Sequence, residues 1–133
     1  MKPQKSLRAR AMDILSRQEI SRVGLKRKLA PYAESEEELE KVLDEFAERN
    51  WQSDQRYAEA YIHSKSRQHG SLRLKQALAQ QGIDETVSRE FMPDKESELQ
   101  TAVAVLRKKF KQPAADLKDK QKQARFLAYR GFD

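Results

Sequence analysis

The 133-residue chain has no cysteine, only four glycines and four prolines, and no long apolar run. Without cysteine there are no disulfides and no thiolate metal ligands, and a reducing compartment is favoured. No apolar run approaches the roughly 18 residues that indicate a membrane-spanning helix. The basic N-terminus also lacks the apolar core and the cleavage site of a secretory signal. We therefore expect a cytoplasmic protein without a membrane span.

Patterns that carry chemistry are also missing. The four glycines form no phosphate-binding loop, because neither GxGxxG nor GxxxxGK[ST] occurs. His63 and His69 are the only histidines, and a spacing of six does not place them on one helix face. We interpret both as exposed polar side chains. The carboxylates of residues 34–48 follow one another as on a solvated helix face, not across a cleft. The sequence predicts no enzyme, no metal, no cofactor and no small-molecule substrate.

An internal repeat is what the chain does have. Leu29, Leu78 and Leu127 lie 49 residues apart, and each sits in a similar stretch of sequence. LKQALAQQGIDE, from Leu74, matches QARFLAYRGFD, from Gln123, whereas LKRKLAPYAES, near Leu29, is looser. A fixed period of this length is typical of a tandem array and not of a domain with one active-site cleft.

Each repeat shows the apolar spacing of helices, and no run alternates as a strand does. We predict three helices per unit, with side-chain caps at Ser21, Ser35, Ser53 or Asp54, and Asp84. The fold class is then all-α: an elongated array of tandem three-helix units whose third unit lacks its last helix. The predicted units are residues 1–52, 53–93 and 94–133.

The incomplete third unit has a consequence for the end of the chain. We expect Phe126, Leu127 and Phe132 to be poorly covered and the end to fray, or the natural protein to continue for about one more helix. Asp116 should cap the second helix of this unit, and Asp133 should cap a third.

The charge alternates in step with the repeat. Net charge is +6, but residues 1–31 carry nine bases and two acids, whereas residues 32–60 carry three bases and ten acids. Residues 61–80 are again basic, 81–100 acidic and 101–133 basic. This pattern suggests a polyanionic partner that faces one part of every unit. The alternative is that the charges only solvate amphipathic helices.

The candidate binding residues are the bases of the first two helices of the units, with the acidic third helix as a counter-face. They are Arg22, Lys26, Arg27 and Lys28 in the first unit, Lys65, Arg67, Arg73 and Lys75 in the second, and Lys108, Lys109, Lys111, Lys118, Lys122, Arg125 and Arg130 in the third. Rows of such residues bind phosphates with salt-dependent affinity that is mostly independent of sequence. We assign the aromatic side chains to packing, with Trp51 at the link between the first two units.

Four segments, taken in order, resemble one family. Residues 21–29 are similar to SxxELxxKL, residues 53–62 to DDxRFAxxYI, residues 70–83 to GxxRIxxELxxxGI, and residues 123–133 to a closing RxxRFLxxRGF. Gly24 and Ala77 stand where that family usually has Glu, and Gln55 where it has an acid. In this order the segments resemble the RecX family of bacterial recombination regulators over nearly the whole chain.

The resemblance implies a curved array of three-helix repeats that lies in the groove of the RecA–DNA filament. It implies inhibition of the ATPase, strand exchange and co-protease activities of RecA, and weak DNA binding. We therefore expect a non-enzymatic regulator of recombination, DNA repair and the SOS response. The alternative is a general DNA-binding helical protein that coats or bridges nucleic acid.

Overall fold

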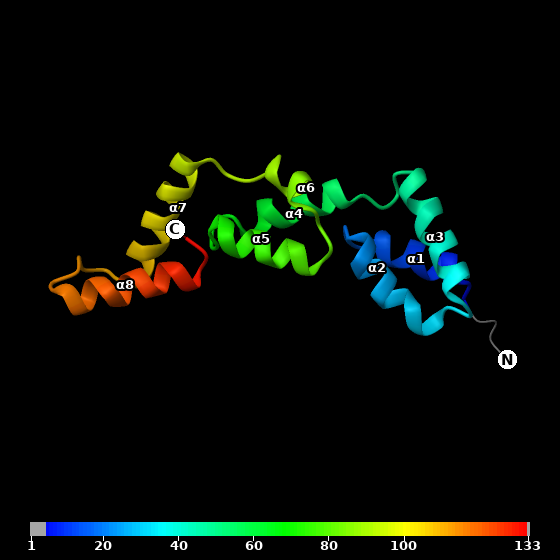
Figure 1. The fold of residues 1–133 in the computed structure, drawn as a ribbon, viewed down its shortest axis with the longest axis horizontal. Helices are drawn as coiled ribbons and strands as arrows, with labels where there is room; N and C mark the ends of the chain where they lie inside the picture. The colour runs from blue at the N-terminus through cyan, green and yellow to red at the C-terminus, as the bar shows by residue number, and fades with distance from the viewer. Residues whose placement is uncertain (1–4, 133) are drawn as a thin grey trace.

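Helices make up the part of the chain that the structure describes, residues 5–132 of a computed structural model, and that part contains no strand. The elements are α1 (Leu7–Leu15), α2 (Arg22–Leu29), the 3-10 helix η1 (Ala30–Tyr32), α3 (Glu36–Glu48), α4 (Asp54–Lys65), α5 (Ser71–Gln80), α6 (Glu85–Arg89), α7 (Lys95–Lys109) and α8 (Leu117–Tyr129). They follow one another along an elongated molecule, as Figure 1 shows. The predicted all-α class is confirmed.

Polar side chains fix where most of these helices begin. The hydroxyl of Ser21 accepts a hydrogen bond from the Gly24 amide, and that of Ser35 accepts one from the Glu38 amide. Ser53, Asp84 and Asp116 cap α4, α6 and α8 in the same way. Each cap satisfies an amide that the first helical turn leaves without a partner. The helix starts predicted at these residues are confirmed.

The first two groups of helices each enclose an apolar core. Helices α1, α2 and α3 pack on one another around Leu25, Leu29, Leu43 and Phe46, all essentially inaccessible to solvent. Trp51 packs edge-on against Phe46 and so covers this core. Burial of such side chains gives each group of helices most of its stability.

The second group, α4, α5 and α6, repeats the arrangement. Its core is built on Leu74 and Leu78, with Ile62 and Ile83 beside them. Leu29 and Leu78 are therefore the same buried position in two successive units, as the repeat predicts. Ile83 folds back on the last turn of α5 because Gly82, at φ +74°, reverses the chain there.

The last two helices, α7 and α8, bury fewer side chains than the first two groups of helices do. α7 and α8 pack against each other, with Phe110 edge-on to Phe126, but no residue of α8 is buried. Leu99, Leu117 and Tyr129 are exposed. The pair therefore depends on α5 as well as on its own contacts.

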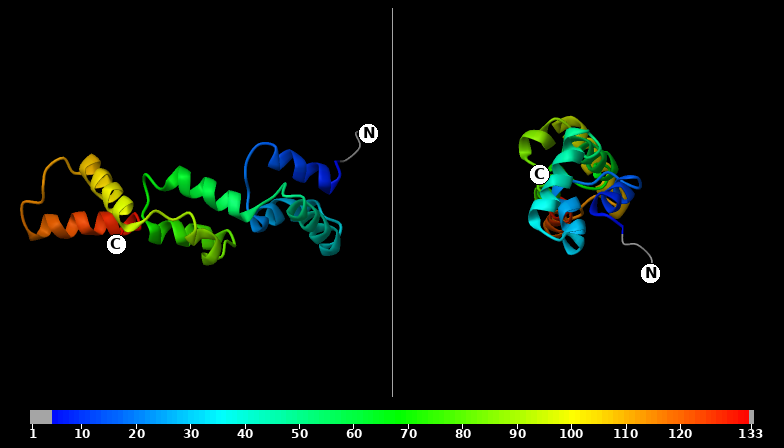
Figure 2. Two further views of the ribbon diagram at one scale, coloured as in Figure 1. Left: turned by 90° about the horizontal axis from the view of Figure 1, so that it is seen from above. Right: turned by 90° about the vertical axis from the view of Figure 1, so that its right-hand side faces the viewer.

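Backbone hydrogen bonds join α8 to α5. The Gly70 amide donates to the carbonyl of Arg130 (2.8 Å), and the Leu72 amide donates to that of Gly131 (3.1 Å). The C-terminal end of α8 thus meets the N-terminal end of α5. The two helices lie end to end along one edge of the molecule (Figure 2, left). Helices α1, α4 and α7 lie along the other edge.

The end of the chain is better covered than the sequence suggested. Phe132 is only 4% exposed, and Phe126 and Leu127 are half-buried. The expectation of poor coverage is wrong for Phe132, because the junction between the end of α8 and the start of α5 buries it. The predicted cap Asp133 lies outside the described residues.

Candidate nucleic-acid interface

The bases of α2 that point towards α3 are neutralised within the protein. The Arg22 guanidinium lies 3.0 Å from Glu40 and 2.6 Å from Asp44, and the Lys26 ammonium lies 2.8 Å from Glu40. Hydrogen bonds from Lys26 and Arg22 hold the pKa of Glu40 below its usual value. The predicted acidic counter-face is therefore the internal partner of these two bases, which are not free for a ligand.

Arg27 and Lys28, on the same helix, have different surroundings. The Arg27 guanidinium donates to the carbonyl of Gln80 at 3.2 Å and so links the first two helix groups. Lys28 is exposed and lines a hollow with Arg10 and Tyr32. In the second group, the Lys75 ammonium is 3.9 Å from the Glu85 carboxylate. Of these bases, only Lys28 is exposed without a hydrogen-bond or ion-pair partner among the described residues.

A groove where the turn after α4 meets α7 and α8, here called the groove between α4, α7 and α8, brings several bases together. It has a volume of about 460 Å³ and is lined by Arg67, Gln68, Val105, Lys108, Lys109, Phe126 and Arg130. None of its four bases lies within ion-pair distance of a carboxylate among residues 5–132. Within residues 5–132, no acidic side chain lines the groove. Unpaired bases of this kind attract phosphate.

The floor of this groove is partly aromatic. Phe126 is half-buried, and the Arg130 guanidinium lies over its ring, 5.2 Å from the centroid. The spacing of the aromatic residues in the sequence predicts a role in packing only. The groove position of Phe126 was missed because its helix spacing is that of a core residue, and its partial exposure depends on how the turn after α4, α7 and α8 come together.

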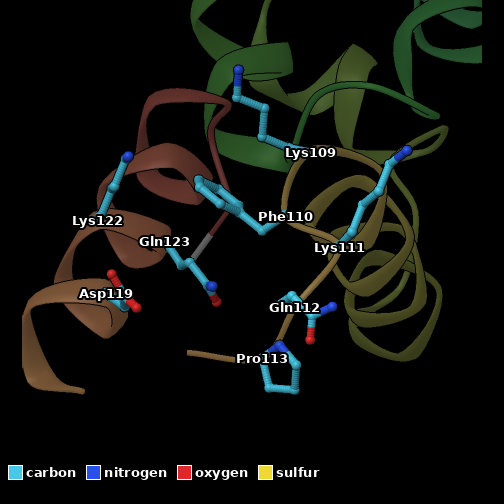
Figure 3. Close-up of a pocket in the computed structure, with 8 residues that line it drawn as sticks. All are labelled: Lys109, Phe110, Lys111, Gln112, Pro113, Asp119, Lys122 and Gln123. Carbon is cyan, nitrogen blue, oxygen red and sulfur yellow. The ribbon is translucent and has the colours of Figure 1, made fainter. Parts of the chain in front are cut away.

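A second basic hollow adjoins the groove at the turn after α7 (Figure 3). It encloses about 330 Å³ and is lined by Lys109, Phe110, Lys111, Gln112, Pro113, Asp119, Lys122 and Gln123. Figure 3 shows the ammonium groups of Lys109 and Lys111 pointing away from the Phe110 ring. Asp119 is the one acidic lining residue, so this hollow is less strongly basic than the groove.

The remaining predicted bases surround these hollows less closely. Lys118 and Arg125 are exposed on α8, whereas Lys65 is partly buried at the end of α4. The Arg73 guanidinium lies 5.3 Å from the centroid of the Tyr129 ring and is held at the junction of α5 and α8. The structure therefore gathers the bases of the last two units but does not make all of them available.

His69 departs from its interpretation as an exposed side chain. It is partly buried, and its Nδ1 atom is enclosed without a hydrogen-bond partner in the part of the chain that the structure describes. Burial lowers the pKa of His69 below its ordinary value, and the charges of Arg73, Arg130 and Lys65 lower it further. This environment favours the neutral form of the histidine, which lies close to Arg73, Arg130 and Lys65.

The described residues contain no cluster of three or more potential metal ligands. None of the helices in residues 5–132 is long and apolar enough to span a bilayer. What the two hollows offer chemically is electrostatic attraction and two partly exposed aromatic rings, Phe110 and Phe126, a combination that suits nucleic-acid backbone and bases.

Comparisons with known proteins agree with this architecture. Residues 53–92 match the family model for the second three-helix domain of RecX, and residues 96–133 match that for the third. The regulatory protein RecX of Neisseria gonorrhoeae (strain NCCP11945) is 84% identical over 133 residues, which span this whole chain and 87% of that protein. The regulatory protein RecX of Chromobacterium violaceum is 48% identical over 128 residues, 96% of this chain and 84% of its own.

A solved structure shares the fold. The crystal structure of RecX from Lactobacillus salivarius superposes with a TM-score of 0.82 at 19% identity, over 96% of this chain and 86% of the other. At that identity the likeness concerns the helical architecture alone. The sequence relatives and the two domain models go further, and they show that this chain belongs to the RecX family.

Proposed function

We propose that this protein is a non-enzymatic, cytoplasmic regulator of homologous recombination and the SOS response. It binds the RecA–DNA filament along its groove and inhibits the ATPase, strand exchange and co-protease activities of RecA. The names of its relatives support a regulatory role. The elongated shape supports a partner with an extended surface, because an array of repeats offers many small contacts in a row.

The uneven pairing of charge is the observation that carries this proposal. In the first helix group the bases Arg22 and Lys26 are held by α3, whose first turn carries the exposed acids Glu36 and Glu37. Towards the other end of the array, the bases of the groove between α4, α7 and α8 are unpaired among the described residues. A nucleoprotein filament presents both protein and phosphate. The end with exposed acids suits the protein, and the end with unpaired bases suits the phosphate.

An ATPase titration tests the proposal. RecA filaments on single-stranded DNA are titrated with this protein at a low and a high salt concentration, and binding to naked DNA is measured in parallel. We expect inhibition at less than one molecule per RecA subunit, and at a salt concentration where binding to naked DNA is already weak. Protein contacts would then carry the interaction when phosphate contacts are screened.

A general DNA-binding protein is the second candidate, and the unpaired basic groove by itself favours it. Such a protein would inhibit RecA only by covering its DNA. Inhibition would then appear only at concentrations that saturate naked DNA, and it would decline with salt in parallel with DNA binding. That outcome would reject filament regulation in favour of coating or bridging.

A further inference from the structure

Two equivalent clefts lie 49 residues apart in the sequence, one in each of the first two helix groups. Each is bounded by the end of the second helix and the start of the third helix of its group. The first, of about 320 Å³, is lined by Lys26, Ala30, Ala33, Ser35, Glu36 and Leu39. The second, of about 250 Å³, is lined by Lys75, Gln76, Ala79, Ile83, Glu85 and Ser88.

Four lining positions coincide when the repeats are aligned. Lys26 corresponds to Lys75, Ala30 to Ala79, Glu36 to Glu85 and Leu39 to Ser88. The repeat that builds the cores has therefore also built the same surface twice. Core positions repeat because every unit must fold, but exposed positions such as these alanines have no such need.

An alanine methyl group forms the floor of each cleft, and a buried residue closes its inner end. Ala30 and Ala79 are exposed, so their methyl groups form an open floor. Leu39 and Ser88, 4% and 2% exposed, close the inner end. A small apolar side chain from a partner would fit on the methyl group, whereas a longer residue at the alanine position would fill the space itself.

The rim of each cleft carries one lysine paired with one glutamate. Lys26 and Lys75 lie 3.7 and 3.9 Å from Glu36 and Glu85, whose side chains are 79% and 64% exposed. Lys26 is in addition held by Glu40 at 2.8 Å. The glutamates are thus the more accessible charges. Further exposed acids, Glu34, Glu37 and Asp84, sit beside the lining residues in the chain.

We propose that the two clefts bind the same short segment of two successive, identical subunits of a protein filament. Each segment places a small apolar side chain on Ala30 or Ala79 and a lysine or arginine against Glu36 or Glu85. The inference rests on the proposed function, since it takes the filament as the partner and adds the surface that meets its protein. Because the lysine of each rim is already within ion-pair distance of a glutamate, the clefts offer phosphate no free positive charge, so nucleic acid is not the occupant.

Neutral fillers of the clefts test this directly. Ala30→Gln and Ala79→Gln occupy the floor without changing charge, and Ala60→Gln, on the exposed surface of α4, is the matched control. We expect each cleft variant to weaken binding to RecA filaments roughly tenfold and the double variant about a hundredfold, because equivalent, separate contacts add in free energy. Binding to naked DNA should stay as in the unchanged protein, and unfolding curves check that each variant folds.

A second set of variants, Glu36→Gln and Glu85→Gln, removes the carboxylates at the rims of the clefts. These should weaken filament binding without weakening DNA binding, because they remove the acceptor for the partner's base. The inference is overturned if either alanine variant binds the filament within twofold of the unchanged protein, or if naked-DNA binding falls by the same factor. The proposed function fails separately, if the unchanged protein shows no preference for the filament over naked DNA.

Discussion

Two glycines with left-handed backbone make room for neighbouring units. Gly82 (φ +74°) faces Val23, and Gly131 (φ +89°) faces the backbone of Arg73. A β-carbon on Gly82 would lie 2.2 Å from a methyl group of Val23. The first unit has Ala33 at the equivalent position, where φ is −81°. Among the described residues no earlier unit packs there, and alanine is accommodated.

Gly82→Ala should therefore destabilise the protein by about 2 kcal/mol, because it combines left-handed strain with a close contact. Urea unfolding gives the loss. The double variant Val23→Ala/Gly82→Ala removes the contact and keeps the strain, so its loss should be smaller than the two single losses added together. Strict additivity would show that Val23 and Gly82 do not press on each other.

The backbone conformation at Gly82 was predictable, but its neighbour was not. A glycine after the last apolar residue of a helix indicates a left-handed cap from local sequence alone. That Val23 lies against it depends on how α2 and α5 are placed, which no local pattern encodes. The same limit explains Phe126 and His69, whose environments are set by the turns between helices.

His69 gives the protein a pH dependence with a definite sign. Its pKa in the folded protein is lowered by burial and by nearby positive charges. The folded state therefore binds fewer protons than the unfolded state, and stability falls as pH falls through the ordinary histidine value. Thermal unfolding at pH 7.5 and pH 5 should show a smaller loss for His69→Gln than for the unchanged protein.

The exposed His63 provides the control, as His63→Gln removes a histidine from the same helix region without touching the junction. Its stability should vary with pH as that of the unchanged protein does. An equal pH dependence in His69→Gln would mean that other groups cause the acid sensitivity.

At the scale of the helix, α5 is unusual because it starts at Gly70, which has no side chain to cap it. A β-carbon there would lie 2.3 Å from the carbonyl oxygen of Gly131. Glu98, on α7, supplies the cap and accepts hydrogen bonds from both the amide and the hydroxyl of Ser71. Asp54 does the same for the Arg22 amide at the start of α2. A carboxylate from the next unit thus completes a helix of the unit before it.

Glu98→Ala should cost about 1–2 kcal/mol, the usual worth of a capping interaction to a partly buried amide. Denaturant unfolding measures it. Combining it with Ser71→Ala isolates the part carried by the hydroxyl, because the double-variant cycle subtracts the effect of each change alone. Glu96→Ala, exposed in the first turn of the same helix, should have a much smaller effect; equal losses would refute the capping role.

The helices themselves were largely predictable, and their pairing was not. Ser21, Ser35 and Asp116 mark helix starts because capping is local chemistry. Lys26 looked like part of a binding face because a helix wheel shows only which side is polar. Whether the polar side of α2 faces solvent or another charged helix depends on the angle between α2 and α3. In this protein the acids of α3 face Arg22 and Lys26.

At the scale of the whole molecule, the unpaired bases should dominate the salt dependence of DNA binding. Lys108→Gln/Lys109→Gln removes two bases of the groove between α4, α7 and α8. The slope of log affinity against log salt for single-stranded DNA should fall by about 0.7 for each lost phosphate contact. Fluorescence anisotropy over a salt series measures this slope.

Lys26→Gln/Lys75→Gln is the matched control. It removes the same formal charge, but from two lysines that lie within 4 Å of carboxylates of the protein itself. Its slope should stay close to that of the unchanged protein. Equal reductions in the two double variants would show that net charge, and not the groove, governs binding. The sequence located the basic stretches but could not separate these two sets of lysines, because pairing is a property of the folded array.

The end-to-end junction of α8 with α5 has a consequence for synthesis on the ribosome. Helix α5 is made early, but the carbonyls of Arg130 and Gly131 that accept its first amides, and the carboxylate of Glu98, are made much later. Domains generally fold as units while the chain emerges. The second unit is therefore expected to leave the ribosome with an unfinished helix start, which residues of the following unit close, so that the first two units are each completed by the next.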